Sequence, residues 1–331
     1  VQGVIYVQVP VRMTVLKLDS GGLFAYAPVA PTPECLRLLS ELEAVHGPVR
    51  HILLPTLAVE HKAFAGAFAR KRPDAQFWAA SAQFSFPIDL PLVAQGLPAN
   101  TRLLPDEQPS GDTAPEWTSQ VEYRVLGPLR EKSGVFQEVV CYDKPTRSLL
   151  VTDLALAAGW QKICLFALYF QSSPLIVASP PDGTLSGATR FFSSAFPPEV
   201  PREARNLGWR GFIAWSWRDT WPEAFESLRS GGKPIVPPIL QVAVLNREPA
   251  RVLEFVDRVA RDFDLTSIIP SHFEAQIVAK PEDWAEAFDF LRKKPISNVN
   301  RALPEADLAF LRDFEKQLVE SGAIRQAAPR V

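Results

Sequence analysis

Strand-like and helix-like segments alternate along this chain of 331 residues in two successive blocks, and each block begins with strands and ends with helices. Apolar residues recur at every second position in the strand-like segments and at every third or fourth position in the helical ones. Since a sheet or an amphipathic helix must bury its apolar face against another layer, this order predicts sheets covered by helices. The fold class expected from the residues is therefore α/β (α+β).

The first block is predicted to run from a hairpin to a set of three strands. Residues 19–22 (DSGG) form a turn signal between two alternating runs, and Thr32 and Gly47 mark the ends of the first helix. Residues 87–117 combine Pro, Gly and acidic residues without a period and predict a long irregular insertion. In order, the expected elements are a hairpin over 4–29, a helix over 33–46, a strand over 49–54, a helix over 60–72, a strand over 75–80, the insertion, and strands over 121–126, 134–142 and 148–152.

The second block contains another irregular insertion and a run of aromatic residues. Residues 172–202 are dense in Pro, Ser and Gly, and residues 208–221 hold the aromatic run. The segment 237–246 fits either a helix or a strand. The other expected elements are helices over 160–170, 222–232, 248–263, 281–294 and 305–322 and a strand over 265–272. We expect residues 1–331 to form a single domain that carries the two long insertions.

Bulk properties exclude several classes of function. The net charge is −2 and charges of both signs are mixed along the chain, so the basic surface of a nucleic-acid-binding or membrane-surface protein is missing. The longest apolar run, residues 163–170, is less than half of the about 20 residues that cross a bilayer. A soluble protein without a membrane span is therefore expected.

Cysteine usage indicates a reducing compartment. Cys35, Cys141 and Cys164 are odd in number, widely spaced and set among apolar residues, which favours reduced thiols over a disulfide framework or a cysteine-based zinc site. The chain starts at Val1 and enters a strand-like pattern at once, so we expect that any targeting segment has been removed or left out.

Four residues with metal-binding side chains lie at or just beyond the ends of predicted strands. Glu60 and His61 follow the strand "HILL", Asp153 closes "SLLVTD" and His272 closes "SIIPSH". Strand ends along one edge of a sheet converge in space, so these imidazole and carboxylate groups can surround a single ion. Zinc, iron or manganese suits such a set of nitrogen and oxygen ligands.

Each of these residues also has an ordinary structural interpretation. Asp153 could cap a helix, Glu60 could interact with a helix dipole, and His272 could bond to the backbone. The coincidence of candidate ligands at three strand ends favours the metal site. His51 opens its strand and His46 lies at a helix end, so both are interpreted as structural.

The order of the candidate ligands resembles the metallo-β-lactamase fold. In that fold a strand ends in a Thr-His-x-His-x-Asp-His motif, a later strand ends in a metal-bridging Asp, and a late strand ends in a final His. On this chain the motif falls on residues 55–61, the bridging position on Asp153 and the final position on His272. The resemblance implies an αββα sandwich of the metallo-β-lactamase type in which Glu60, His61, Asp153 and His272 hold the second metal of the family.

The same resemblance implies that the first metal position is lost. Thr56 and Ala58 stand where the motif has its first two histidines, and the family's middle histidine falls near Gly134. One ion, of zinc, iron or manganese, is therefore the expected cofactor. Neither a Gly-rich phosphate loop nor a dinucleotide fingerprint is present, so no organic cofactor is expected.

Longer phrases look like an uncharacterised plant, algal and cyanobacterial branch of the fold, domain of unknown function 4336. They include "VQGVIYVQVPVRMTV", "GWQKICLFALYFQ", "PPILQVAVLNR" and "IIPSHF", and the resemblance covers nearly the whole chain. It implies a chloroplast location for the eukaryotic members. Relatives carry a longer connection where only "LALAA" joins Asp153 to Gly159 here, through either a natural deletion or an omitted loop.

Two functions are compatible with these features. The first is a mononuclear metal-dependent hydrolase for a small-molecule substrate that the sequence does not identify, with Glu60 or Asp153 as the catalytic proton acceptor. The second is a catalytically degenerate protein that keeps the fold as a binding or assembly subunit. An aromatic cluster would serve as a protein interface if it is exposed, and as core if it is buried. It comprises Trp209, Phe212, Trp215, Trp217 and Trp221.

Overall fold

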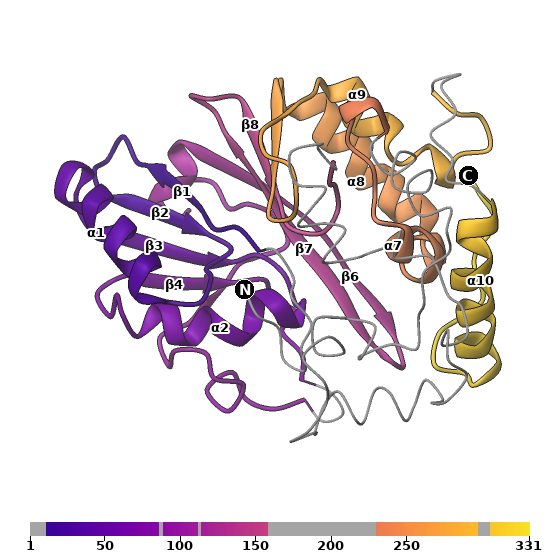
Figure 1. The fold of residues 1–331 in the computed structure, drawn as a ribbon, viewed down its shortest axis with the longest axis horizontal. Helices are drawn as coiled ribbons and strands as arrows, with labels where there is room; N and C mark the ends of the chain where they lie inside the picture. The colour runs from indigo at the N-terminus through magenta and orange to yellow at the C-terminus, as the bar shows by residue number, and fades with distance from the viewer. Residues whose placement is uncertain (1–10, 86–88, 112–113, 158–229, 297–304) are drawn as a thin grey trace, which may run out of the picture.

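Two five-stranded sheets lie face to face, and helices cover the outer side of each sheet (Figure 1). This computed structural model describes residues 11–85, 89–111, 114–157, 230–296 and 305–331, the last range with side chains from residue 311 onward. The predicted αββα sandwich is confirmed in these layers.

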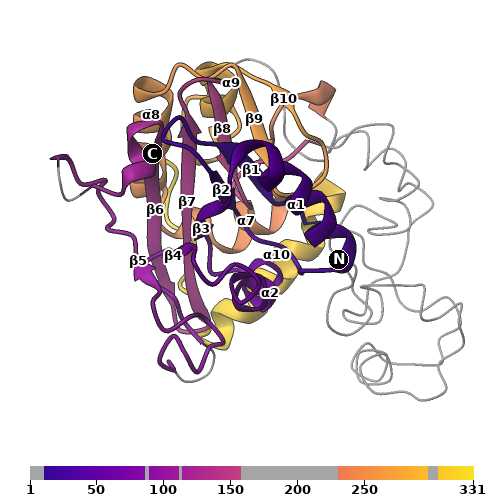
Figure 2. The same ribbon diagram turned by 90° about the vertical axis from the view of Figure 1, so that its left-hand side faces the viewer.

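The first sheet is built from the first third of the chain. Its strands are β1 (Thr14–Lys17), β2 (Leu23–Tyr26), β3 (Val49–Leu54), β4 (Gln76–Ala79) and β5 (Arg102–Leu103), in that spatial order. β1 and β2 form the predicted antiparallel hairpin, and β2 to β5 run parallel. Helices α1 (Pro33–His46) and α2 (Val59–Ala69) connect the parallel strands. In the turned view of Figure 2, α1 lies in front of this sheet.

The second sheet combines two distant parts of the chain. In spatial order its strands are β10 (Ile277–Val278), β9 (Ser267–Pro270), β8 (Ser148–Val151), β7 (Gly134–Asp143) and β6 (Val121–Glu131). β8 and β9 are parallel, and the other pairs are antiparallel. Helices α7 (Pro238–Ala243), α8 (Pro249–Asp262), α9 (Pro281–Glu286) and α10 (Glu305–Glu320) lie on its outer side (Figure 1).

Three apolar cores separate the four layers. In β3, Ile52 and Leu54 face the outer helices, whereas Leu53 faces the second sheet, because successive side chains of a strand point to opposite faces. The outer core of the first sheet contains Leu39, Phe68 and Phe77, the central core contains Phe24, Trp117, Tyr123 and Cys141, and the outer core of the second sheet contains Val140, Leu149, Val256 and Trp284.

Helix α1 has the predicted ends. The side chain of Thr32 accepts a hydrogen bond from the backbone N–H of Cys35 at 3.2 Å, and Gly47 ends the helix with a φ of 88°. Cys35 and Cys141 are free thiols, as expected. Among the described residues, no helix is long and apolar enough to cross a membrane.

Several predicted boundaries differ from the structure. The insertion 87–117 contributes β5, whose two residues are too few to show a period. β6 continues to Glu131 through a register shift at Gly127-Pro128, a dipeptide that usually marks a break but is tolerated at a bulge on an edge strand. The ambiguous segment 237–246 contains the helix α7, and the predicted helix 281–294 ends as α9 at Glu286.

Other predictions lie outside the described residues. They concern the helix over 160–170, the insertion 172–202, the aromatic cluster that includes Trp209, Trp215, Trp217 and Trp221, most of the helix over 222–232, and Cys164. The exposure of those tryptophans stays a prediction.

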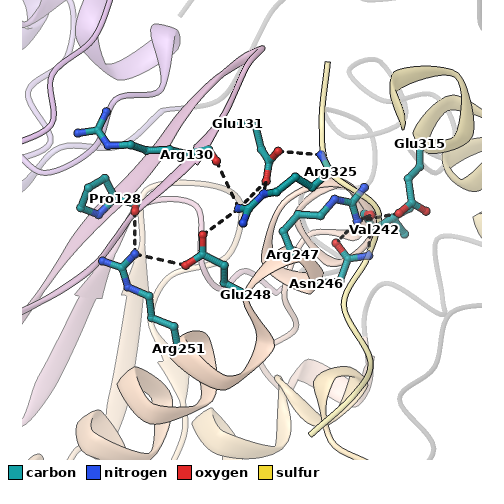
Figure 3. Close-up of polar contacts among 10 residues, drawn as sticks. All are labelled: Pro128, Arg130, Glu131, Val242, Asn246, Arg247, Glu248, Arg251, Glu315 and Arg325. Carbon is teal, nitrogen blue, oxygen red and sulfur yellow. Dashed lines mark hydrogen bonds and ion pairs between the residues drawn. The ribbon is translucent and has the colours of Figure 1, made fainter. Parts of the chain in front are cut away.

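The chain end after α10 is bonded to the second sheet (Figure 3). Arg325 forms ion pairs with Glu131 of β6 at 2.7 Å and with Glu248 before α8 at 2.9 Å, and it also donates to the carbonyl of Arg130 at 3.3 Å. Further along, the N–H of Val331 donates to the carbonyl of Leu291 at 3.0 Å.

Candidate metal centre

Backbone pairing brings Asp153 and His272 together. β8 and β9 are parallel neighbours in which Val151 pairs with Pro270, and the N–H of Ser271 donates to the carbonyl of Val151 at 2.9 Å. Asp153 lies two residues beyond the end of β8, and His272 lies two residues beyond the end of β9. The two side chains therefore start from equivalent points on one sheet edge.

His61 reaches the same place from the first sheet. β3 ends at Leu54, and four residues lead into α2, whose first turn carries His61. Those residues are tied to the second sheet, because the N–H of Val139 in β7 donates to the carbonyl of Pro55 at 2.7 Å. The two sheets thus meet at the point where the three side chains converge.

Three ligand atoms form a compact group. The Nε2 atoms of His61 and His272 are 3.2 Å apart, and Oδ1 of Asp153 lies 3.1 Å from Nε2 of His272 and 3.9 Å from Nε2 of His61. Two ligands held at about 2.0–2.1 Å from one tetrahedral ion lie about 3.3 Å from each other. The spacing therefore fits a shared ion.

The protonation of the group suits metal binding. Burial lowers the pKa of His61 to about 4, although the charge of Asp153 opposes this shift. Burial by itself raises the pKa of Asp153, but the hydrogen bond with His272 and the charge of His61 outweigh it and leave the pKa below its ordinary value. At neutral pH a neutral imidazole and a carboxylate are therefore present, which are the forms that bind metals.

The second nitrogen of His61 has no fixed partner. Nδ1 is buried and forms no hydrogen bond with any described residue. The polar contacts of the ring with described residues are thus those of Nε2, with Nε2 of His272 at 3.2 Å and with Oδ1 of Asp153 at 3.9 Å. An ion at Nε2 would place the proton of the ring on Nδ1.

The other oxygen of Asp153 contacts Thr56, which stands where the resemblance places the first histidine of the motif. The hydroxyl of Thr56 donates to Oδ2 of Asp153 at 3.4 Å and accepts from the N–H of Ala58 at 3.3 Å. Thr56 is buried, and Ala58 has no ligand atom in its side chain. A hydroxyl group rather than an imidazole therefore lies next to Oδ2 of Asp153.

Glu60 lies outside the compact group of ligand atoms formed by His61, Asp153 and His272. It is half-buried in the first turn of α2. Burial and the neighbouring charge of Asp153 raise the pKa of Glu60, against the charge of His272. Glu60 thus lies beside the centre, and its carboxylate binds a proton more strongly than an ordinary glutamate does.

Sequence reasoning missed Glu138, which the structure places directly behind Asp153. Its carboxylate accepts the backbone N–H groups of Thr152, Asp153 and Leu154 at 2.7, 2.9 and 3.1 Å. Burial and the charge of Asp153 raise its pKa to about 8, although the N–H donors oppose the shift. An acidic residue inside the apolar run "VFQEVVCY" was the available signal.

Gly134, near which the resemblance places the middle histidine, lies at the tip of the β6–β7 hairpin and pairs with Glu131.

His51 has a different set of partners from the three ligand residues. Its Nδ1 is 3.5 Å from the indole nitrogen of Trp78, and its Nε2 is 4.0 Å from Glu116.

Fold and site together define a class of protein: a sandwich of the metallo-β-lactamase type whose candidate centre consists of two histidines and one aspartate. The chain belongs to the family described as a domain of unknown function (DUF4336), which matches residues 1–158 and 154–290. The two matched parts meet in the short connection after Asp153. No curated protein matches the chain.

Three solved structures are similar to the chain. A DIM-1 metallo-beta-lactamase exposed to ceftazidime shares 10% identity over 85% of each chain, with a TM-score of 0.39. A metallo-beta-lactamase from Pontibacter korlensis shares 11% over 85% of this chain and 87% of its own, also with a TM-score of 0.39. A peroxy diiron species of the chemotaxis sensor ODP shares 12% over 87% and 88%, with a TM-score of 0.43. Likenesses at this level say nothing about the site.

Proposed function

We propose that the protein is a mononuclear metal-dependent hydrolase that acts on a small molecule. The observation that carries this proposal is the convergence of His61, Asp153 and His272, whose ligand atoms all lie within 4.8 Å of one another. Two imidazoles and one carboxylate suit zinc, iron or manganese, and three protein ligands leave coordination positions open for a substrate.

The residues divide the work between binding and proton transfer. His61, Asp153 and His272 hold the ion, which when bound would polarise a carbonyl or phosphoryl oxygen as a Lewis acid. Glu60 accepts and returns the proton at its carboxylate. Its half-buried position beside the centre and its raised pKa support this role, because a general base works best when its pKa is close to the working pH.

A single ion is supported by the residues next to Oδ2 of Asp153. A second ion would need ligands near Oδ2, where Thr56 donates a weak hydrogen bond and Ala58 offers no ligand atom. The expected stoichiometry is one ion per chain.

Metal analysis tests the proposal. Purified protein should contain close to one equivalent of zinc, iron or manganese by mass spectrometry, and the double variant His61→Ala/His272→Ala should lose it. His51→Ala is the matched control, because this histidine is also buried but lies outside the centre.

Chelation should lower the melting temperature of the wild type, since binding to the native state alone adds about 2.7 kcal/mol to the free energy of unfolding at a hundredfold excess of ion over Kd. If the wild-type protein binds no added metal and its melting temperature does not change with chelator, the proposal of a metal-dependent hydrolase is refuted.

A binding or assembly subunit is the second candidate, and Thr56 and Ala58 at the former ligand positions favour it. It would use the tryptophan cluster at 209–221 as a protein interface. Fluorescence quenching by acrylamide tests this use, because buried indoles would be protected from the quencher.

The plastid location implied by the resemblance is also a proposal, and imaging of a fluorescent fusion in a plant cell tests it.

A further inference from the structure

Glu138 is a buried acidic residue without a basic partner in the described part of the chain. It lies in the interior of β7, is 0% exposed, and forms no ion pair with any basic side chain of the described residues. Burying a carboxylate is costly, and apolar residues of similar volume often replace such groups without loss of stability. Packing alone therefore does not explain a glutamate at this position.

The partners of Glu138 indicate what the carboxylate contributes. After β8 the chain leaves the sheet, and the three successive N–H groups of residues 152–154 point to one place instead of to a neighbouring strand. Buried N–H groups require acceptors. Glu138 supplies them, because its two side-chain oxygens accept all three N–H groups.

Asp153 is consequently held at both ends. Glu138 binds its backbone N–H at 2.9 Å, and Thr56 donates to its Oδ2 at 3.4 Å, so Oδ1 remains directed at His272. The backbone of Glu138 also forms a bridge with Thr56, in the segment that leads to His61. One residue thus links the two loops that carry the carboxylate and the first imidazole.

We propose that Glu138 is a positioning residue of the metal centre, which holds the turn 152–154 so that Oδ1 of Asp153 is already at ligand distance before an ion binds. The inference rests on the proposed function, because it requires that His61, Asp153 and His272 bind a metal. A preformed centre binds more tightly, since less ordering accompanies binding. Loss of such an outer partner typically weakens metal affinity by about 10–100-fold.

The test replaces Glu138 by glutamine in the full chain. Glutamine has the same size but only one acceptor oxygen, and its NH₂ group opposes a backbone N–H. Titration of metal-free protein with Co²⁺ should give a Kd about 10–100-fold higher than the wild-type value, with an altered d–d absorption spectrum. Hydrogen exchange of peptides covering residues 148–157, measured on the metal-free protein, should be about tenfold faster, as a weakened local turn requires.

Gln137→Leu is the matched control. Gln137 is the adjacent residue in β7 and is equally buried, but it bonds to Ala82 and Ser81 of the first-sheet loop. This variant should lose stability while keeping the cobalt Kd and the exchange of 148–157. If Glu138→Gln does not fold, Glu138→Asp keeps the carboxyl group on a shorter side chain and should show the same two changes to a smaller extent.

The outcomes separate the two proposals. If the wild type binds Co²⁺ and the Glu138→Gln variant has the same Kd and the same hydrogen exchange, the positioning role alone is overturned. An equal rise of Kd in Gln137→Leu also overturns it, because the effect would then be general destabilisation. Wild type that binds no metal overturns the proposed function and the positioning role with it.

Discussion

Burial decides the protonation of His61, and with it part of the pH dependence of the metal-free protein. The pKa of His61 in the folded chain is about 4, below the ordinary value of 6.5, chiefly because its ring is removed from water. Between these two values the unfolded chain binds more protons than the folded one. The free energy of unfolding should therefore fall as the pH falls from 6.5 to 4.

His61→Asn should remove this dependence. The histidine contributes about 3 kcal/mol over the whole interval, from about 1.4 kcal/mol for each tenfold change in proton affinity. Urea unfolding of the metal-free wild type and variant at pH 7.0 and pH 4.5 measures the effect. Subtracting the pH-dependent change of the variant from that of the wild type removes the contribution of groups that titrate in both proteins. An identical loss of stability in the variant would show that His61 is not the group responsible.

Among the elements, α2 depends on a close backbone contact. A Cβ atom at Gly66, in the middle of α2, would lie 1.8 Å from the carbonyl oxygen of Gly96. Only glycine allows the helix to approach the loop this closely. Because the first turn of α2 carries Glu60 and His61, the contact also determines where these side chains lie.

Gly66→Ala is expected to destabilise the protein by about 1–3 kcal/mol through overpacking, although alanine is the better helix former. It should also weaken metal binding, because α2 must move away from Gly96. Gly134→Ala is the matched control, since a Cβ atom there meets nothing within 4 Å. Thermal melting and cobalt titration of both variants check the prediction, and equal melting temperatures would contradict it.

At the scale of the whole molecule, the C-terminal segment protects the edge of the second sheet. β6 is an edge strand, and arginine side chains from elsewhere donate to some of its carbonyls. Arg251 donates to the carbonyl of Gly127. Figure 3 shows that Arg251 also donates to the carbonyl of Pro128, and Arg325 to that of Arg130. Uncovered edges of this kind pair with other chains. The segment after α10 thus covers part of a surface that could otherwise associate.

Removal of residues 322–331 should lower the melting temperature and cause concentration-dependent self-association. Arg325→Ala should have a smaller effect, about 1 kcal/mol or less, because the side chain is largely exposed and such ion pairs contribute little singly. Arg330→Ala, an exposed arginine in the same segment, serves as control. Analytical ultracentrifugation measures the association, and a truncated protein that stays monomeric at all concentrations would argue against edge protection.

Local patterns were sufficient for much of the fold. The hairpin of β1 and β2, the ends of α1 at Thr32 and Gly47, and the long helix α8 follow from alternation, capping and helical period, which depend on neighbours within a few residues. The strand β5 and the continuation of β6 past Pro128 did not follow from local patterns, because only pairing with a neighbouring strand makes them part of a sheet.

The sequence by itself determined which residues are able to bind a metal and that they follow strand ends, since residue type and local period are written in it. Tertiary structure decided the rest. The parallel register of β8 and β9 brings Asp153 and His272 into contact across 119 positions of the chain, and the first turn of α2 brings His61 to them. It also left Glu60 outside the ligand group and placed Glu138 behind Asp153, because distances between residues far apart in sequence are set by how the two sheets pack, which no local pattern records.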